Sequence, residues 1–355
     1  MAEVVGIVGV GRMGQAFAHH LLQAGFEVHG FDLEAKRMDE LAGRGGIPAD
    51  SPAAAARGAR WILTSLPNSE AVRNAVLGPA GIVEGAAQGA ILADTTTSRP
   101  QDSERLGAEL AARGIRFLDA GVSGTSAMAW KKDLVVLAGG APEDFTAGLP
   151  CLQAIGRAVY RMGPVGAGAM TKLIVNLVLA GNRLALAEGL VLGIKAGVAG
   201  ESLLAVLQDS ACSSKTMGDK GPKMLRGDYT PEGLVGIALK DAHLMLEQGR
   251  RFGAPLLLTS LWPRCSRPRP RAACWNGTPW RSSRCCATWR VSPGVPSPGP
   301  RDRRFPKLLS FFAARAIRRL DVPAGRLLSY VRTDSRYGSR PERGGTLERE
   351  GRARG

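Results

Sequence analysis

Two polar side chains interrupt an apolar stretch in the middle of the chain, at a spacing that suits proton transfer. Lys172 and Asn176 are four residues apart in a segment, 169–196, that the pattern predicts to be one long helix. Side chains four apart share one face of a helix and lie about 6 Å from each other. Burial and a second cation, for which Lys240 is the candidate, would lower the pKa of Lys172 enough for general acid/base catalysis near neutral pH. The alternative is a solvated surface lysine.

A glycine-rich turn near the start of the sequence has the pattern of a dinucleotide-binding loop. Gly9-Val10-Gly11-Arg12-Met13-Gly14 stands between an expected strand at 4–9 and an expected helix at 15–24. In that pattern the glycines permit a tight turn, close approach of the backbone to a pyrophosphate, and close packing of helix on strand. The N-terminus of the helix favours the negative charge of the phosphates. A glycine-rich turn without a ligand is the alternative.

Asp32 indicates which nicotinamide cofactor would bind. It ends a second expected strand, 27–32, and follows Gly11 by 21 residues, where a carboxylate can accept hydrogen bonds from the adenosine ribose. Its charge would repel a 2′-phosphate, which predicts NAD as the cofactor. Lys36 and Arg37 leave NADP open, unless they are simply solvated.

The elements that must position these residues alternate along the chain. Apolar runs typical of strands lie at 4–9, 27–32, 61–65, 90–94, 117–120 and 134–138, with helical stretches between them. This alternation predicts an α/β fold, in which a Rossmann-type, mainly parallel sheet domain at 1–164 is followed by an all-helical domain at 165–261. A loop rich in Pro and Gly is expected at 218–231, and an irregular tail at 262–355.

Several further segments match the pattern of one known family. They are Leu66-Pro67-Asn68, Asp94-Thr95-Thr96-Thr97, Asp119-Ala120-Gly121-Val122-Ser123-Gly124, the segment from Gly166 to Asn176, and Leu239-Lys240-Asp241. Their order and spacing resemble the β-hydroxyacid dehydrogenases, which include 3-hydroxyisobutyrate dehydrogenases. The resemblance covers roughly residues 3–261. Its most specific part is the element Gly-x-Gly-x-x-x-Lys-x-x-x-Asn.

The resemblance implies a role for each matching residue. Lys172 would be the general acid/base, and Asn176, Ser123, Gly124 and Lys240 would hold the substrate. Thr97 and Lys240 would border the nicotinamide, while the turn at Leu66 and Pro67 would lie along the cofactor. Taken alone, Ser123 could be an ordinary loop serine, Thr97 could merely end a strand, and Lys240 with Asp241 could be an exposed charge pair.

Some positions depart from the family pattern. Gly121 stands where proline is usual, Thr125 where a second glycine is usual, and the segment 127–133 is bulkier than its counterparts. Trp130 and the lysines after it are expected to reshape the substrate pocket or its rim. The family therefore implies only a small carboxylate with a β-hydroxyl or aldehyde group. An imine reductase is an alternative with the same architecture, although those enzymes usually lack this lysine.

Charge and cysteine content separate the chain into two parts. Residues 262–355 hold 22 basic and 6 acidic side chains, which accounts for the whole net charge of +16, whereas residues 1–261 hold 25 of each. The main part therefore has no basic character that would favour nucleic acid. No paired Cys or His spacing suggests a metal site. Two scattered cysteines and the lack of a recognisable leader predict a cytoplasmic protein. The apolar stretch 173–194 carries Asn182, Arg183 and Glu188, which favours a buried helix over a membrane span.

The composition after Leu261 suggests a change of reading frame. All eight Trp and Cys residues between 262 and 289 have codons beginning with TG, so reading one base earlier turns each into a codon for Leu, Val or Met. Their spacing would then suit amphipathic helices, which the family places here. With such helices intact, the resemblance implies a homo-oligomer, either a dimer or a tetramer.

The alternative is a genuine basic extension. Its arginines are irregularly spaced and broken by prolines, so most of it is expected to be disordered. It could accompany a non-catalytic dinucleotide-binding protein and bind nucleic acid.

Overall fold

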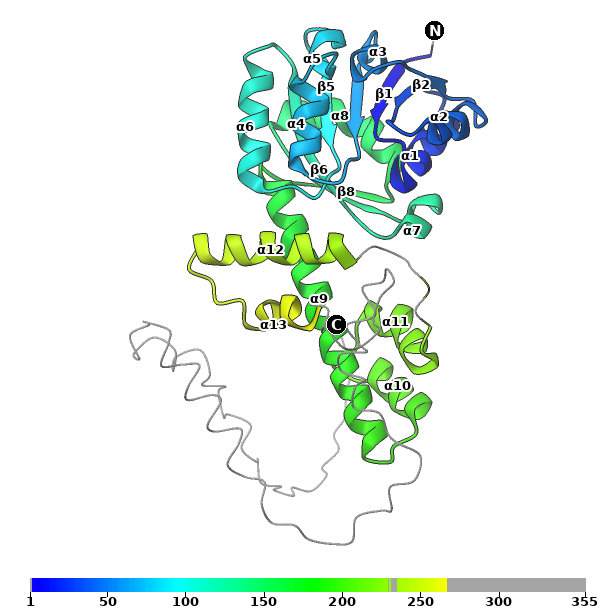
Figure 1. Cartoon of the computed structure of the whole chain (residues 1–355), viewed down its shortest axis with the longest axis vertical. Helices are drawn as coiled ribbons and strands as arrows, with labels where there is room; N and C mark the ends of the chain where they lie inside the picture. The colour runs from blue at the N-terminus through cyan, green and yellow to red at the C-terminus, as the bar shows by residue number, and fades with distance from the viewer. Residues whose placement is uncertain (1, 229, 231–234, 267–355) are drawn as a thin grey trace, which may run out of the picture. The chain divides into compact units, whose positions relative to one another are not determined.

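A computed structural model describes residues 2–228, 230 and 235–266 of the 355-residue chain. Within this range an eight-stranded sheet carries helices on both faces, and helices also make up the part that follows (Figure 1). The predictions of a disordered, nucleic-acid-binding or frameshifted segment fall almost entirely on 267–355, outside the described residues.

The first six strands of the sheet are parallel and all end along the same edge of the sheet, and the strand order shows where on this edge a ligand could bind. The strands are β1 (Val4–Val8), β2 (Glu27–Phe31), β3 (Ile47–Pro48), β4 (Trp61–Thr64), β5 (Ile91–Asp94), β6 (Arg116–Ser123), β7 (Val135–Gly139) and β8 (Ala158–Gly163). They are arranged 3-2-1-4-5-6-7-8, and only the β6–β7 pair is antiparallel. The chain winds outward in opposite directions from β1 and β4, and a crevice at such a reversal is where doubly wound folds bind ligands.

The predicted strands are all present, and two more were not predicted. β3 has only two residues and ends in Pro48, and β8 is an edge strand whose side chains are half-buried or exposed. Neither strand has the buried apolar run by which sequence reasoning recognises a strand, because each lies at a margin of the sheet.

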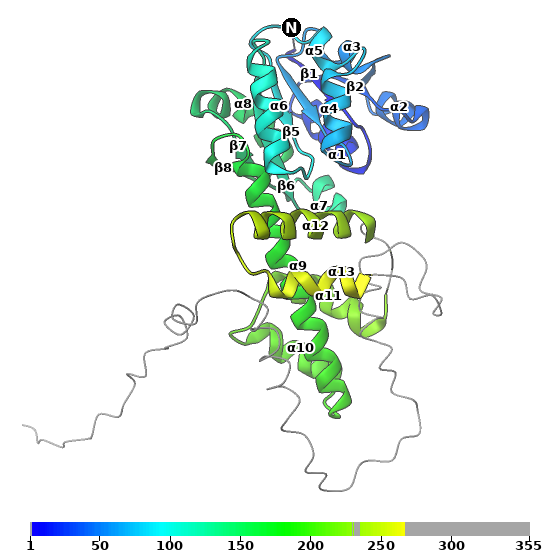
Figure 2. The same ribbon diagram turned by 60° about the vertical axis from the view of Figure 1, so that its left-hand side comes forward.

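Helices cover both faces of the sheet (Figure 2). The side chains of each strand point alternately to the two faces and pack against these helices. Val5 and Ile7 pack with Phe17 on the face covered by α1 (Arg12–Gln23) and α8 (Pro142–Ile155). Ile62 and Leu92 pack on the opposite face. That face is covered by α3 (Pro52–Ala56), α4 (Ser69–Leu77), α5 (Ile82–Gly85) and α6 (Pro100–Ala111). The short helices α2 (Ala35–Ala42) and α7 (Ser126–Trp130) follow β2 and β6.

The second part of the chain is helical, as predicted. Its helices are α9 (Ala167–Lys195), α10 (Gly200–Asp209), α11 (Lys215–Arg226), α12 (Val235–Arg251) and α13 (Leu257–Ser266). A small core joins α9, α10 and α11 through Leu186, Leu190, Leu204 and Met217.

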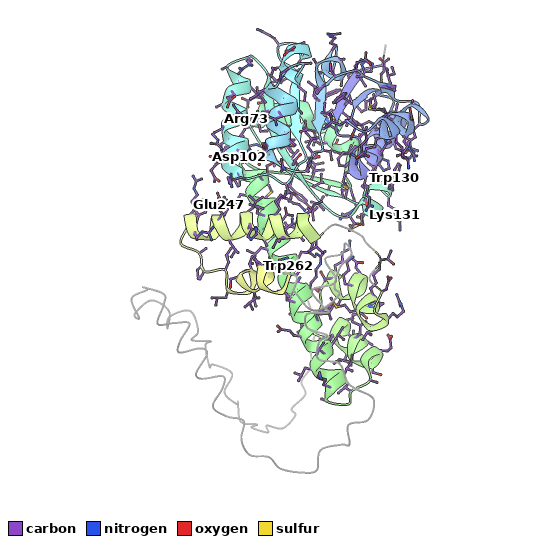
Figure 3. All side chains as sticks on the ribbon, in the orientation of Figure 1. Arg73, Asp102, Trp130, Lys131, Glu247 and Trp262 are labelled. Atoms are coloured by element: carbon purple, nitrogen blue, oxygen red, sulfur yellow. The ribbon has the colours of Figure 1, made fainter. Side chains whose placement is uncertain are left out.

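Two predictions for this part were wrong. The loop expected at 218–231 is helical as far as Arg226, because Gly221 packs directly on Leu204 and holds α11 in place despite Pro222. Residues 262–266, expected to belong to an irregular tail, are helical, since α13 continues to Ser266 and Trp262 is buried near α12 (Figure 3). Trp262 is a buried apolar residue of α13. The Arg- and Pro-rich composition that begins at this residue predicts an irregular segment instead.

α9 is less buried than the sequence predicted. By length and composition it is apolar enough to cross a membrane, and only 17% of an apolar window of 18 residues within it is buried. Its first turns pack against β6 and β7, whereas Ile174, Val178 and Leu192 are more than half exposed. The expectation of a buried helix therefore does not hold within a single chain.

Candidate active site

The glycine loop forms a backbone cradle at the edge of the sheet between β1 and α1. Gly9 has a φ of 93°, and a Cβ there would collide with the carbonyl oxygen of Ser65. A Cβ on Gly14 would collide with the carbonyl oxygen of Gly9. Beside Gly11, by contrast, the nearest atom to a Cβ would be Nη1 of Arg37 at 3.7 Å, an ordinary contact, so the backbone here is not crowded by the fold. Because α1 begins at Arg12, the amides of its first turn, Arg12 and Met13, face the same opening. This cradle fits the pyrophosphate of a dinucleotide.

Asp32 follows β2 at the same edge and is held by an arginine. Nη1 of Arg37 donates to both carboxylate oxygens of Asp32, at 3.2 Å each, and Nη2 of Arg37 pairs with Glu34 at 2.6 Å. The Asp32 side chain is only 7% exposed. The suggestion that Arg37 is merely solvated was therefore wrong, whereas Lys36 is exposed.

Side chains after β4 and β5 meet at the next part of the edge. The Thr96 hydroxyl accepts a hydrogen bond from the amide of Leu66 at 3.0 Å. Buried Asp94 accepts from the Thr64 hydroxyl at 2.8 Å and from the Thr96 amide at 3.0 Å. These bonds lock the Leu66–Pro67 turn against the strand end that carries Thr97.

Lys240 reaches this locked turn from α12. Its Nζ donates to the carbonyl oxygen of Thr97 at 2.7 Å and to that of Pro67 at 3.3 Å. Lys240, Thr97 and Pro67, which lie in three separate sequence motifs, are therefore in contact.

Lys172 stands behind this group, in the first turns of α9. Its side chain is 9% exposed and its stem lies against Gly121, where an added Cβ would approach Cβ of Lys172 to 3.0 Å. Nζ of Lys172 donates to Oδ1 of Asn176 at 2.8 Å. Nδ2 of Asn176 donates to Asp241 at 2.9 Å, and the other oxygen of Asp241 lies 3.3 Å from Nζ of Lys240. A continuous polar chain therefore joins the two lysines.

Burial is the main cause of the unusual acidity of Lys172. It lowers the pKa of the amine to about 8, against the opposing attraction of Asp241, while Arg183 and Lys240 lower it further. The predicted second cation, Lys240, acts in the expected direction. Burial also raises the pKa of Asp241.

Sequence reasoning missed the contributions of Asp241 and Arg183. Arg183 lies eleven residues after Lys172, about three turns along α9, so helical spacing could have placed it on the same face. Asp241 was seen only as the partner in a charge pair. Its contact with Asn176 joins residues 65 positions apart, which no local pattern reveals.

α12 is fixed to the sheet domain at a second point. Arg99 pairs with Glu247 at 2.8 Å, and the amides of Gln101 and Gln248 bond to each other at 3.0 and 3.1 Å. Figure 3 shows Glu247 facing the beginning of α6, near Asp102. With Lys240 bound at Thr97, α12 is held at two places, and this positions Asp241.

Ser123 and Gly124 lie at the end of β6, just beyond Gly121. Gly124 has a φ of 146°, and a Cβ there would collide with Leu134, so the position requires glycine. Among the described residues, no hydrogen bond links Ser123 to Lys172 or Asn176. Thr125, the departure from the family pattern, caps α7 by accepting the amide of Met128 at 3.3 Å.

Trp130 packs on the sheet domain. Its ring lies 5.4 Å from the His19 ring of α1 and 4.8 Å from the guanidinium carbon of Arg44. Figure 3 shows Trp130 beside Lys131 at α7. These contacts fix α7 on α1. A reshaping of the substrate pocket or its rim by Trp130 and the lysines after it stays a prediction. No cluster of His, Cys, Asp or Glu suited to a metal occurs among the residues that the structure describes.

Two family models cover almost all of the described chain. Residues 4–163 match the NAD binding domain of 6-phosphogluconate dehydrogenase. Residues 166–267 match the NAD-binding model of NADP-dependent 3-hydroxyisobutyrate dehydrogenase. The boundary between the two falls at the start of α9.

Curated relatives match over the same range. The chain is 35% identical to L-threonate dehydrogenase of Cupriavidus necator over 262 residues, 73% of this chain and 88% of the relative. It is 32% identical to 3-sulfolactaldehyde reductase of Escherichia coli over 255 residues, 72% of this chain and 86% of the relative.

Solved structures separate the main interpretation from its alternative. The crystal structure of 3-hydroxyisobutyrate dehydrogenase from Salmonella typhimurium superimposes with a TM-score of 0.71 at 27% identity, covering 79% of this chain and all but 1% of the other. An imine reductase from Pseudomonas sp. shares only the fold, at 19% identity and a TM-score of 0.53. Together with the glycine cradle and the lysine pair, these likenesses show that the chain belongs to the β-hydroxyacid dehydrogenase family of NAD(P)-dependent oxidoreductases.

Proposed function

We propose that Lys172 is the general acid/base of this dehydrogenase, and that residues 1–164 hold the cofactor while 165–261 complete the substrate site. The observation that carries the proposal is the buried Nζ of Lys172, bonded to Asn176 and close enough to Lys240 and Arg183 for both to lower its pKa. A lysine with a pKa of about 8 exists in both protonation states near neutral pH, as proton transfer in both directions requires.

The residues of the glycine loop would hold the cofactor. Gly9, Gly11, Arg12, Met13 and Gly14 would surround the pyrophosphate. The other cofactor contacts would come from Asp32 at the ribose and from Leu66, Pro67, Thr97 and Lys240 along the nicotinamide. When bound, the nicotinamide supplies the hydride acceptor or donor.

The protein's own contribution is to move one proton. In oxidation, neutral Nζ of Lys172 takes the proton of the substrate hydroxyl. In reduction, the ammonium of Lys172 returns a proton to the aldehyde oxygen. Asn176 holds Nζ in place through its Oδ1, and Asp241 fixes the amide of Asn176. Ser123 and Gly124 would hold the substrate from the end of β6.

The substrate that fits this site is a small carboxylate with a β-hydroxyl or aldehyde group. Lys172, Lys240 and Arg183 give the site a cationic character that suits a carboxylate. NAD is the proposed cofactor, because the carboxylate of Asp32 stands where a 2′-phosphate would be repelled. We further propose a cytoplasmic enzyme, consistent with the free thiols of Cys151 and Cys212, and a homo-oligomer that covers the exposed apolar side chains of α9.

The test is to replace Lys172 by alanine in the full chain. Oxidation of a panel of short β-hydroxyacids should fall by at least about a thousandfold in kcat, while the Kd for the cofactor stays within about twofold. Asn176→Ala should fall less. Near-normal turnover by Lys172→Ala would reject the proposal, and the cofactor Kd would show that the variant is folded.

A further inference from the structure

Asp119 occupies an unusual place in the middle of β6. Its side chain is 2% exposed and lies in register with Asp94 on β5 and with Gly139 on β7. A buried carboxylate must have strong hydrogen-bond donors around it, because burial disfavours its charge.

The donors come from the beginning of α9. The amide of Gly166 donates to Oδ1 of Asp119 at 2.9 Å, and the amide of Ala169 donates to Oδ2 at 2.6 Å. α9 has no capping side chain of its own, since Gly166 occupies its N-cap with a φ of 95°. Asp119 therefore serves as the cap of a helix that begins almost 50 residues later in the chain.

Backbone contacts make this attachment rigid. A Cβ on Gly168 would collide with the carbonyl oxygens of Asp119 and Leu137, and a Cβ on Gly139 would collide with Oδ1 of Asp119. The first turn of α9 thus rests on the strands without intervening side chains. Lys172 follows one turn later, with its stem against Gly121 of the same strand.

We infer that Asp119 is a positioning residue for proton transfer, because it caps α9 from β6 and so fixes Lys172 relative to the substrate residues at the end of the same strand. The inference rests on the proposed role of Lys172. It assigns to Asp119 no contact with the substrate or the cofactor.

The surroundings of Asp119 give the inference a pH signature. Burial, with a smaller contribution from Asp94, raises the pKa of Asp119 to about 6 despite the bonds from Ala169 and Gly166. β7 carries no charged residue, Glu104 of α6 lies beside Gly166, and Lys172 is the nearest charged residue of α9. Protonation below about pH 6 removes acceptor capacity from the carboxyl group and loosens the cap.

The sign of this effect on stability distinguishes it from acid unfolding. The folded protein binds this proton more tightly than the unfolded chain, so the contribution of Asp119 to stability falls as pH rises from about 4 to about 6. Catalytic activity that depends on the cap should rise with pH over the same range, because the ionised carboxylate holds the cap. If protonation of Asp119 lowers the activity at pH 5, its contribution to the stability of the protein should therefore not be lower at that pH.

The first experiment compares Asp119→Asn with the wild type in the reductive direction, where Lys172 stays protonated between pH 5 and 7. The amide side chain presents only one acceptor to two N–H donors. We expect kcat at pH 7 to fall by between about tenfold and a hundredfold, with the cofactor Kd within about twofold. The wild-type kcat should fall below pH 6, and the variant should lack this limb. Ser51→Ala is the matched control, since Ser51 caps α3 in the same domain, far along the chain from Lys172.

The second experiment uses the wild-type protein and does not depend on activity. Hydrogen exchange, corrected for its intrinsic pH dependence, should show the segment 166–170 losing protection between pH 7 and 5, while 51–57 does not. Unchanged protection would overturn the capping role, even if Asp119→Asn failed to fold. Wild-type kcat in Asp119→Asn, with Lys172→Ala inactive, would overturn the positioning role. An active Lys172→Ala would instead reject the proposed function and leave the cap intact.

Discussion

The amine of Lys172 is tuned by groups that come from three elements. Asn176 and Arg183 belong to its own helix, Asp241 and Lys240 to α12, and Gly121 of β6 leaves room for its stem. Of these, the sequence pointed to Asn176 and Lys240, because both lie in motifs with fixed spacing. Asp241 could not be recognised as part of the site, since its contact depends on how α12 crosses α9.

The tuned amine predicts opposite pH profiles in the two directions. In the proposed mechanism oxidation uses neutral Lys172, so kcat/KM should rise as pH increases through about 8, whereas reduction uses the ammonium and should fall through the same value. Initial rates measured from pH 6 to 10 in both directions would check this. Lys240→Met removes a cation that lowers the pKa, so both limbs should move to higher pH. Limbs that stay in place would contradict the role of Lys240.

The Asp32–Arg37 pair predicts how cofactor choice can be changed. Asp32→Ala removes the carboxylate that is proposed to repel a 2′-phosphate, and it frees Arg37 from its bonds to Asp32 so that Arg37 can pair with a phosphate. The ratio of kcat/KM for NADP to that for NAD should rise at least about tenfold. Glu34→Ala is the matched control, because it breaks the other ion pair of Arg37 and leaves Asp32 in place. A wild-type enzyme that prefers NADP would refute the expected preference.

α9 is the element that links the sheet domain, which carries the glycine loop, to the helical domain. Its approximate bounds followed from the apolar periodicity of the sequence. Its attachment did not, because the contact of Gly168 with β6 and β7 depends on strand register. The pattern also failed for α11, where Gly and Pro indicated a loop and packing on Leu204 maintains a helix instead.

Two glycines of α9 provide a matched test of this attachment. Gly168→Ala places a Cβ against rigid backbone carbonyl groups of β6 and β7, so the free energy of unfolding should fall by about 1–3 kcal/mol. Gly189→Ala lies on the same helix with no atom within 4 Å, and should stabilise by about 0.5–1 kcal/mol. Urea unfolding of both variants would check the difference. Equal effects would contradict direct backbone packing at Gly168.

At the scale of the whole molecule, the described part of the chain contrasts in composition with the sequence after α13. The chain covers 88% of the length of the L-threonate dehydrogenase and 86% of the length of the 3-sulfolactaldehyde reductase. Ile174, Val178 and Leu192 on α9, and Leu257 and Leu258 on α13, remain exposed. Apolar side chains in such numbers on one part of a protein mark a surface that is normally covered.

We predict that the gene contains a frameshift near the codon for Leu261. Reading one base earlier should encode Leu, Val or Met at the eight Trp and Cys positions between 262 and 289. The protein made in that frame should elute as a homo-oligomer in size-exclusion chromatography with light scattering. Ordinary codon usage through residue 300 in the present frame would contradict the predicted frameshift. Salt-sensitive DNA binding that disappears on deletion of 267–355 would favour a basic extension instead.

The sequence by itself determined the family, the glycine cradle and the pairing of Lys172 with Asn176, because each depends on residues close together in the chain. Helical spacing and the order of strands and turns express those relations directly. Only the tertiary structure decided that Asp119 caps α9, that Asp241 joins the two lysines and that the pKa of Lys172 falls to about 8. Those properties arise from burial and from contacts between segments about 50 or more residues apart, which local patterns do not encode.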